Sequence, residues 1–373
     1  GYDAKNEEPV LFSFKAMVLA TGGAGAIYER TDCPLRVTGD GYSLAYHAGA
    51  ELRDMEFVQF FPVALAEPGH PPFLLGGQLT EEGRIVNRFG EDIPEKHGVK
   101  ERPLVLKSRG PLSVAIMKEV LAGNGVEGAV LLDAKEVFRT WGKEGLESNR
   151  RVTYLTERLD ADEKPLRVAP IAHFNMGGIV SDENGRTDVP GLFAAGEVVG
   201  GVHGANRHGG NALTDITVFG ARAGRAAAEY ASRQETKSTL GLGKTEFERY
   251  ETLWREGGVS PADVMSVLRR LMWRKVGPIR TKQGLEEVYN RVKSLKEKTS
   301  KITAVNGREM LVALEVTMAL DAAEFIVKAA LERKESRGAH YREDHPEEKE
   351  GWLKTVIISK GHSGEPVTYT RPL

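Results

Sequence analysis

The sequence predicts a protein of several domains, of mixed α/β and α+β class. Its 373 residues suffice for roughly two to three domains, and 40% hydrophobic with 28% charged residues is an ordinary globular balance. Up to about residue 235, short apolar runs and glycine-rich turns alternate with helical patterns. From about residue 236 onward, long amphipathic helices rich in Glu, Lys, Arg and Leu follow, which indicates a helical domain after a mixed one.

The N-terminal residues predict two strands, at 10–14 and 16–20. The second strand leads directly into Thr21-Gly22-Gly23-Ala24-Gly25, where glycines let the backbone approach a ligand closely. A short buried strand that ends in glycines resembles one edge of a Rossmann-like dinucleotide-binding domain, and taken alone it reads equally well as an ordinary tight turn after a strand. The usual first unit of that fold is a strand followed by Gly-x-Gly-x-x-Gly at the start of a helix, and it is missing here. We therefore expect a partial Rossmann-like domain, made of residues 1–56 and 172–235.

Between these two parts, residues 57–171 read as an inserted α+β domain in which Pro and Gly separate short strands and helices. A helix is expected from Leu112 to about Leu121, with Arg109 just before its first turn. The helical domain is expected over 236–345, with a start signal at Ser260-Pro261-Ala262-Asp263 and a last helix over 307–333. Residues 346–373 are expected to form a C-terminal tail.

Charge, cysteine content and hydropathy argue against several classes of function. The formal net charge of -2 gives no excess of positive charge for a nucleic-acid partner. Because Cys33 is the only cysteine, this chain alone can form no disulfide and hold no Cys-rich zinc site or iron–sulfur cluster, so we expect no metal and a separate electron carrier. No apolar run approaches 18 residues and no export signal is visible, so a cytoplasmic protein is expected.

Residues 171–213 are the most informative segment, because a histidine, an arginine and many glycines lie within about forty residues. Glycines this dense let a loop wrap around a flat ligand. A buried strand at 192–195 ends in Gly196-Glu197, whose acid can accept a hydrogen bond from a ligand hydroxyl. Asn211-Ala212-Leu213 then begins a helix whose free N–H groups suit a polarised carbonyl.

These segments resemble the flavoprotein family of succinate dehydrogenase, fumarate reductase and L-aspartate oxidase, without the N-terminal part of its FAD-binding domain. They follow the family's order over nearly the whole chain. The matching segments are Ala20-Thr21-Gly22-Gly23, Thr38-Gly39-Asp40-Gly41, Asp54-Met55-Glu56-Phe57-Val58-Gln59, Ala172-His173-Phe174-Asn175-Met176-Gly177-Gly178, Gly196-Glu197, His203-Gly204-Ala205-Asn206-Arg207, Met272-Trp273-Arg274-Lys275-Val276-Gly277 and Glu335-Ser336-Arg337-Gly338-Ala339-His340-Tyr341-Arg342-Glu343-Asp344.

The resemblance implies FAD as cofactor and residues 57–171 as a capping domain. By motif, the residues expected to contact FAD are Ala20, Thr21, Gly22, Gly23, Asp40, Glu197, Asn211, Ala212 and Leu213. Without the resemblance, Asp40 reads equally well as an acid that stabilises a turn, and Glu197 as a helix or loop cap.

The resemblance also implies the catalytic residues. Arg109 matches the proton donor, and His173 and Arg207 match the pair that binds the substrate carboxylate, for which a guanidinium fork is well suited. His208 adds a titratable group near the same site. Each has an ordinary alternative: a packed histidine for His173, a solvated residue for Arg109, and a structural ion pair for Arg207.

Two departures from the family concern the substrate. Phe61 stands where the family usually has a histidine, so we expect Phe61, His173, Arg207 and His208 to line the substrate site. Leu75-Gly76 replaces a Thr-Glu pair whose acid relays a proton to the arginine, although Thr80-Glu81-Glu82 follows closely and is a candidate substitute. Both losses favour a substrate with only one charged end.

We therefore expect an FAD-dependent oxidoreductase that reduces or forms a C=C bond next to a carboxylate. One alternative is a non-catalytic fragment or subunit that needs a separate N-terminal FAD-binding chain, and another is an amino-acid oxidase like L-aspartate oxidase. The expected partners are a small carboxylate substrate, an iron–sulfur or other electron-transfer subunit, and that N-terminal chain. Such partner subunits would place the protein peripherally at a membrane.

Overall fold

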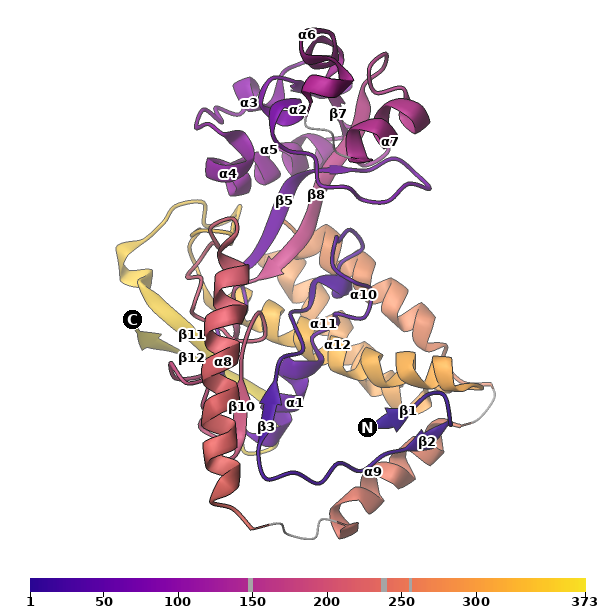
Figure 1. Ribbon diagram of the computed structural model, residues 1–373, viewed down its shortest axis with the longest axis vertical. Helices are drawn as coiled ribbons and strands as arrows, with labels where there is room; N and C mark the ends of the chain where they lie inside the picture. Colours follow the sequence, from indigo (N-terminus) through magenta and orange to yellow (C-terminus); the bar gives the residue numbers. More distant parts are fainter. Residues whose placement is uncertain (147–149, 236–239, 255–256) are drawn as a thin grey trace.

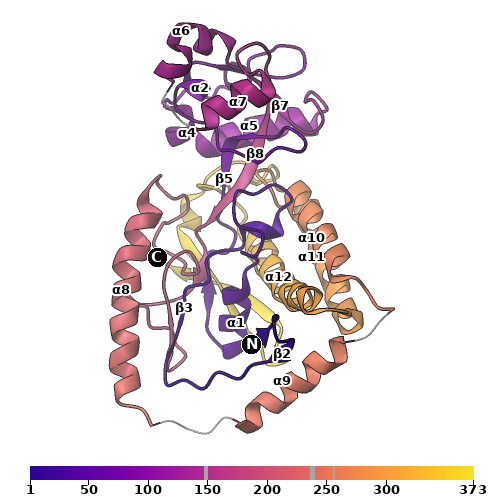
Figure 2. The same ribbon diagram turned by 45° about the vertical axis from the view of Figure 1, so that its right-hand side comes forward.

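The computed structural model describes residues 1–373 except 147–149, 236–239 and 255–256. A small upper domain stands on a larger base, and the long strands β5 (Val58–Leu65) and β8 (Leu166–Asn175) run between the two (Figures 1 and 2). In the described part of the chain, no helix is long and apolar enough to cross a membrane. The expected multidomain α/β architecture is confirmed.

The base contains a short parallel strand pair, β3 (Met17–Leu19) with β10 (Leu192–Ala194). Helix α8 (Asn211–Ser232) packs along both strands, and α1 (Asp40–Ala48) follows the glycines after β3 (Figure 1). The strand expected at 10–14 is wrong. Leu11, Phe12 and Phe14 are exposed and form no ladder with described residues, whereas β1 (Tyr2–Asp3) and β2 (Glu8–Pro9) form a short hairpin just before them.

A second sheet of the base has the order β12-β11-β4-β9, with every neighbouring pair antiparallel. Its inner strands, β4 (Leu52–Arg53) and β11 (Lys354–Lys360), lie between β9 (Gly178–Ile179) and β12 (Pro366–Pro372). Residues 346–373 are therefore not a tail. Val356 and Ile358 are fully buried in the core of the base, and this burial fixes the end of the chain in place.

The helical part consists of α9 (Leu240–Leu253), α10 (Pro261–Lys275), α11 (Lys282–Lys298) and α12 (Gly307–Glu332). Short 3-10 turns lie after β3 at 25–27, after α11 at 299–301 and before β11 at 350–352. Ser260 caps α10 as predicted, since its side chain accepts the Asp263 N–H at 3.4 Å. Helix α12 packs against α1, α10 and α11, and one hydrophobic core joins these helices to β3 and β10.

The upper domain has its own hydrophobic core around an antiparallel sheet of order β5-β8-β7-β6, completed by β6 (Arg84–Val86) and β7 (Val130–Asp133). Its helices are α2 (Gln78–Glu81), α3 (Ile93–Lys96), α4 (Leu104–Lys107), α5 (Arg109–Leu121), α6 (Lys135–Gly145) and α7 (Arg150–Leu159). Helix α5 begins at Arg109 and not at Leu112, because the Leu112 N–H already donates to the Ser108 carbonyl at 2.8 Å. Pro111, which has no N–H, is tolerated in this first turn.

The sequence contains one literal match to Gly-x-Gly-x-x-Gly, at residues 123–128. The structure places it after α5 and before β7, where Val126 and Ala129 hydrogen-bond to each other across a turn. Because no strand precedes it and no helix follows it, this match offers a phosphate no helix N-terminus.

Candidate active site

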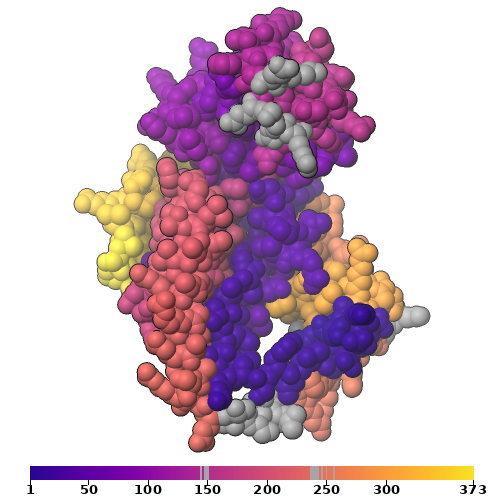
Figure 3. Space-filling model, in the orientation of Figure 1, coloured from indigo at the N-terminus to yellow at the C-terminus, as the bar shows by residue number. Residues whose placement is uncertain are grey.

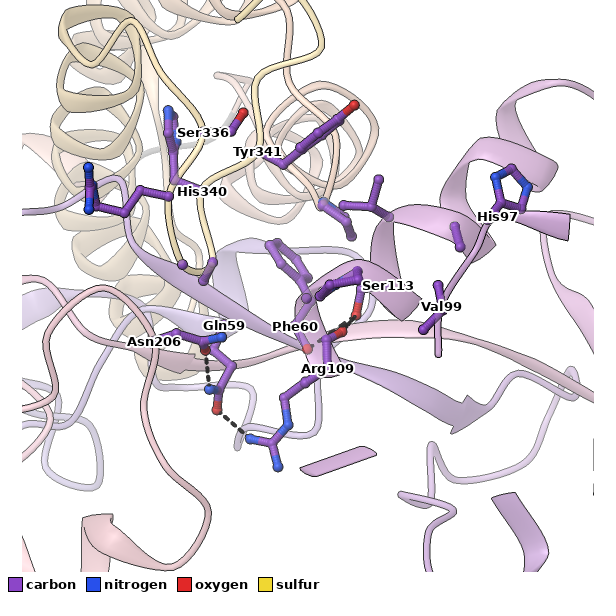
Figure 4. A pocket seen from close by; sticks show the side chains of 18 of the residues that line it. Gln59, Phe60, His97, Val99, Arg109, Ser113, Asn206, Ser336, His340 and Tyr341 are labelled. Atoms are coloured by element: carbon purple, nitrogen blue, oxygen red, sulfur yellow. Dashed lines mark hydrogen bonds between the residues drawn. The ribbon is translucent and has the colours of Figure 1, made fainter. Parts of the chain in front are cut away.

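Two buried arginines meet on one amide oxygen where β5 leaves the base. Arg109, in the first turn of α5, donates from Nη1 to Gln59 Oε1 at 2.7 Å, and Arg207 donates from Nη2 to the same oxygen at 3.1 Å. Gln59 Nε2 in turn donates to Asn206 Oδ1 at 2.6 Å (Figure 4) and to the Arg207 carbonyl at 2.8 Å. Gln59 therefore fixes the distance between two guanidinium groups that come from different domains.

Neither guanidinium forms an ion pair with a carboxylate of the described residues. Arg109 is 8% exposed and Arg207 is 9% exposed, and burial lowers the pKa of both below the ordinary arginine value. The positive charge of Arg207 lowers the pKa of Arg109 further. Arg207 Nε is buried without a hydrogen-bond partner among the described residues, and its Cζ lies 4.5 Å from the centre of the Phe174 ring. Two positive charges with spare N–H donors suit an anionic ligand.

His173 lies in β8 next to these arginines and is held by an acid that the sequence analysis missed. Its Nδ1 is 2.8 Å from Asp32 Oδ2, and both side chains are about one-fifth exposed. An Nδ1–H donated to Asp32 leaves Nε2 as the ring nitrogen free to meet a ligand. No motif pointed to Asp32, because a contact across 141 residues leaves no local signal in the sequence.

Phe61 forms the opposite wall of the site. Its ring centre is 5.5 Å from Arg109 Cζ and 5.7 Å from the His173 ring in an edge-on arrangement. The candidate substitute acid, Glu81, points elsewhere: it pairs with Arg102 at 3.4 Å, and no hydrogen bond among the described residues joins it to Arg109. Its neighbour Thr80 donates to the Leu75 carbonyl at 3.0 Å and is buried.

Two of the residues expected to hold a flavin, Gly23 and Glu197, meet at Asn175 at the end of β8. A Cβ added at Gly23 would come within 2.3 Å of Glu197 Oε1 and 2.7 Å of Asn175 Oδ1, so only glycine fits there. Glu197 Oε1 accepts the Asn175 N–H at 2.9 Å, and burial raises the pKa of Glu197 to about 7. Asn175 Nδ2 is buried and has no partner among the described residues, so it can still donate to a ligand. These residues fit a polar, planar cofactor.

The other residues expected to contact FAD make fewer contacts with one another than Gly23, Asn175 and Glu197 do. Asp40 begins α1, and its Oδ1 accepts the Thr38 hydroxyl at 2.5 Å, as the turn alternative requires. Ala20, Thr21 and Gly22 follow β3 with open surface on one side. At the start of α8, the Asn211 and Leu213 N–H groups donate to loop carbonyls, whereas the Ala212 N–H meets no acceptor in the described part of the chain. His208 is exposed, and its side chain forms no hydrogen bond with a described residue.

A cavity of about 340 Å³ lies beside Arg109, between α5 and residues 336–341 (Figure 4). The turn at 337–340 forms its far wall and touches both arginine-bearing elements. The Ala339 N–H donates to the Ala205 carbonyl at 2.9 Å, and a Cβ on Gly110 would lie 3.4 Å from the Gly338 carbonyl oxygen. This turn therefore sets the position of α5 relative to the loop that carries Arg207.

In the described residues, no group of three His, Cys, Asp or Glu side chains could hold a metal ion. The site instead joins a glycine-lined cradle to a pair of arginines that form no ion pair with a carboxylate of the described residues, while the charges of Glu197 and Asp32 act on Arg207 from further away. The space-filling view shows the cap standing over the base (Figure 3). Residues 2–213 match a family model described as an FAD binding domain, and residues 265–373 match one described as the fumarate reductase flavoprotein C-terminus. Fold, site and family models together define a flavoprotein whose cofactor is FAD.

The chain belongs to the fumarate reductase and succinate dehydrogenase flavoprotein family, as the sequence motifs predicted. It is 37% identical over 367 residues to a subunit of the fumarate reductase (CoM/CoB) of Methanothermobacter marburgensis, covering 96% of this chain. It is 34% identical over 349 residues to L-aspartate oxidase 1 of Ralstonia nicotianae, covering 91% of this chain. A point mutant of FrdA from the E. coli quinol fumarate reductase superimposes with a TM-score of 0.84 and 31% identity over 96% of this chain.

The chain spans only part of these relatives. It covers 66% of the M. marburgensis protein, 62% of the R. nicotianae protein and 65% of the E. coli chain. The comparisons thus confirm the family of this chain and its cofactor, FAD.

Proposed function

We propose that this protein is the substrate-binding and proton-donating part of an FAD-dependent oxidoreductase that acts on a C–C or C=C bond beside a carboxylate. The observation that carries the proposal is the pair Arg109 and Arg207, both buried, both bound to Gln59 Oε1, and neither matched by a carboxylate of the described residues. Buried charges are ordinarily paired, so an unmatched pair favours an anionic substrate.

The roles of the residues follow from their positions. Arg207 and His173 hold the substrate carboxylate. The Arg207 fork donates to it, and the His173 Nε2–H also donates when the ring is the imidazolium that pairs with Asp32 through Nδ1. Bound FAD supplies the hydride chemistry at one carbon of the double bond. Arg109 delivers the proton to the neighbouring carbon, so the double bond gains a hydride and a proton in total. Burial and the adjacent Arg207 charge lower the pKa of Arg109, which makes this guanidinium a better acid than one in water.

Two further partners are part of the proposal. The cradle at Gly23 and Glu197 suits the flavin end of FAD, but the chain contains no strand–Gly-x-Gly-x-x-Gly–helix unit for the pyrophosphate. We infer that polypeptide outside these 373 residues completes the FAD site, and that an iron–sulfur or other electron-transfer subunit exchanges electrons with the flavin, since Cys33 is the only cysteine here. Such a subunit would associate the protein peripherally with a membrane.

The cofactor part of the proposal is tested by titration with FAD. We expect the 373-residue chain alone to bind FAD weakly, and the complete assembly, called the holoenzyme below, to contain about one FAD per site. Submicromolar affinity of the isolated chain for FAD would contradict the inference that another segment holds the pyrophosphate.

The reaction is tested anaerobically with chemically reduced holoenzyme. Addition of a 2-enoic acid should reoxidise the flavin and give the saturated acid, and the flavin absorbance measures the rate. If no enoic acid reoxidises the flavin and no saturated acid reduces it, the proposed reaction is wrong. Rapid peroxide formation in air with an amino acid as the reductant would instead favour the oxidase activity named for the R. nicotianae relative.

A further inference from the structure

The wall formed by Phe61 bears on the chemical class of the substrate. We propose that the substrate carries a single carboxylate, and that the group at the other end of its double bond is uncharged and apolar. This inference rests on the proposed function, because it concerns the same site. It goes further in naming which end of the substrate is charged and which residue excludes a second charge.

Apart from its contacts with Arg109 and His173, Phe61 is surrounded by apolar side chains. Phe61 is 7% exposed and packs in a separate small cluster with Ala64, Val105 and Ile171, against which Leu74 also packs. These residues come from β5, β8, α4 and the loop before α2, so the cluster spans the lower face of the cap. It offers a substrate dispersion contacts and no hydrogen-bond donor.

The two polar groups against the Phe61 ring are already committed. Arg109 lies over the ring face and is needed as the proton donor. His173 meets the ring edge, but its Nδ1 is held by Asp32 and its position favours the carboxylate that Arg207 binds. The side chains of the cluster itself carry no charge, and the charged groups that contact its backbone are held by other partners. Arg109 donates from Nε to the Val105 carbonyl at 3.1 Å and from Nη1 to Gln59, while the Glu81 carboxylate accepts the Val105 N–H at 3.4 Å. The exposed Arg151 donates to the Leu74 carbonyl at 3.1 Å.

The same wall has room for an apolar substituent. A Cβ built on Gly76 would meet only the tip of the Phe61 ring, at 4.0 Å, and one built on Gly77 would meet no described atom within 4 Å. A second carboxylate placed here would lose its water against Phe61 and lie near the Glu81 carboxylate. The cation over the ring, Arg109, already donates to Gln59 and Val105, so the second charge would be poorly compensated. An alkyl or aryl group would instead bury apolar surface. Both effects favour a monocarboxylic acid over a dicarboxylic one.

The test compares kcat/KM of the holoenzyme for crotonate, cinnamate and fumarate, with a reduced dye as the electron donor. We expect at least one of the two monocarboxylates to exceed fumarate by about tenfold or more, which corresponds to about 1.4 kcal/mol. Phe61→His should shift this ratio at least about tenfold toward fumarate, because a histidine can donate to a second carboxylate. Phe61→Leu, the matched apolar control, should keep the preference for a monocarboxylate.

Binding to the oxidised holoenzyme provides a readout that does not depend on turnover. Calorimetric titration should give a lower Kd for butyrate than for succinate, and Phe61→His should reverse the order. If the wild-type holoenzyme reduces fumarate fastest and binds succinate more tightly, the inference about Phe61 is wrong while the proposed reaction stands. If none of the three acids reoxidises the flavin, and butyrate and succinate do not bind, the proposed function itself fails.

Discussion

The protein contains two clusters of buried arginines that differ in what surrounds them. At the root of the cap, Arg333 donates to Glu56 Oε1 at 2.5 Å and to Glu335 Oε1 at 3.0 Å, and it is 1% exposed. Nearby, Arg342 forms a two-pronged pair with Asp344, at 2.8 and 2.7 Å. In the active site, by contrast, Arg109 and Arg207 share the neutral oxygen of Gln59. The first cluster is compensated by carboxylates of the chain itself, and the second is not matched by any carboxylate of the described residues.

The difference separates structural arginines from functional ones. Arg333 also donates to the Trp352 and Lys354 carbonyls, so it joins the strand that leads to the cap with the C-terminal hairpin. The charge of Arg333 is balanced by Glu56 and Glu335 of the same chain. Arg109 lines a cavity, and Arg207 keeps an unpartnered Nε donor among the described residues, so we expect their charge to be available to a ligand. Four substitutions test whether the two clusters differ in this way.

The largest effect is expected for Arg109→Lys in the holoenzyme. A lysine keeps the charge but not the planar fork or the reach of the guanidinium, so kcat should fall by about 10²–10⁴-fold, the range for loss of a general acid. FAD content, measured from the flavin absorbance, should stay within about a tenth of the wild-type value. An unchanged kcat on the true substrate would remove Arg109 from the catalytic role.

Arg333→Met should act on stability and not on chemistry. Removing one partner of a buried ion pair leaves Glu56 without its main compensation and costs about 3–5 kcal/mol. A lower midpoint of thermal unfolding, followed by circular dichroism, measures the loss. Arg371→Met is the matched control: Arg371 is half-exposed and pairs with Glu51 at 2.8 Å, so its removal should change stability by less than about 1 kcal/mol. Equal effects of the two changes would contradict the structural role of Arg333.

Gln59→Glu would give the active-site arginines a carboxylate partner, as Arg333 already has in Glu56 and Glu335. A carboxylate at this position would pair with both Arg109 and Arg207 and compete with the substrate carboxylate, so KM should rise at least about tenfold, or about 1.4 kcal/mol. The variant gains a matched charge but loses the two hydrogen bonds that Gln59 Nε2 donates to Asn206 Oδ1 and the Arg207 carbonyl, so the prediction concerns KM and not stability. Gln283→Glu adds the same charge on the exposed surface of α11 and should leave KM unchanged. A KM that stays constant in Gln59→Glu would show that the arginines do not bind substrate.

The sequence predicts a site residue when the residues that identify it lie close together in one motif, and it does not predict contacts between distant segments. Arg109, His173 and Arg207 were identified from motifs, and the structure brings all three to the site. Gln59 lay inside one of those motifs, but its role as the bridge depends on contacts across 50 and 148 residues. Periodicity within one segment carries no information about such distant contacts.

Errors in the predicted fold have a similar origin. The apolar run at 10–14 has strand propensity, but without a ladder partner in the described chain it stays extended and exposed. Residues 354–360 read as the end of the chain, yet Ile357 and Ile358 pair with β4, which lies far earlier in the sequence. Helix caps such as Ser260, whose partner is three residues away, were predicted correctly.

The last effect depends on pH and concerns Glu197, a largely buried acid whose pKa the Arg207 charge lowers in part. Its pKa is about 7 in the folded protein, raised mainly by burial, whereas an unfolded glutamate has the ordinary value of 4.5. The folded state therefore holds a proton that the unfolded state has lost between these two values, so stability falls as the pH rises through this window and does not recover above it.

Glu197→Gln removes this dependence while keeping a similar shape. At about pH 5 the variant and the wild-type FAD-free chain should unfold at similar temperatures, and at about pH 8 the variant should be more stable by on the order of 2 kcal/mol. Glu183→Gln, at an exposed position nearby, should show no pH-dependent difference. If the advantage of Glu197→Gln does not grow with pH, then the Arg207 charge keeps Glu197 ionised, and this arginine is compensated from within the chain after all, like Arg333 at the root of the cap.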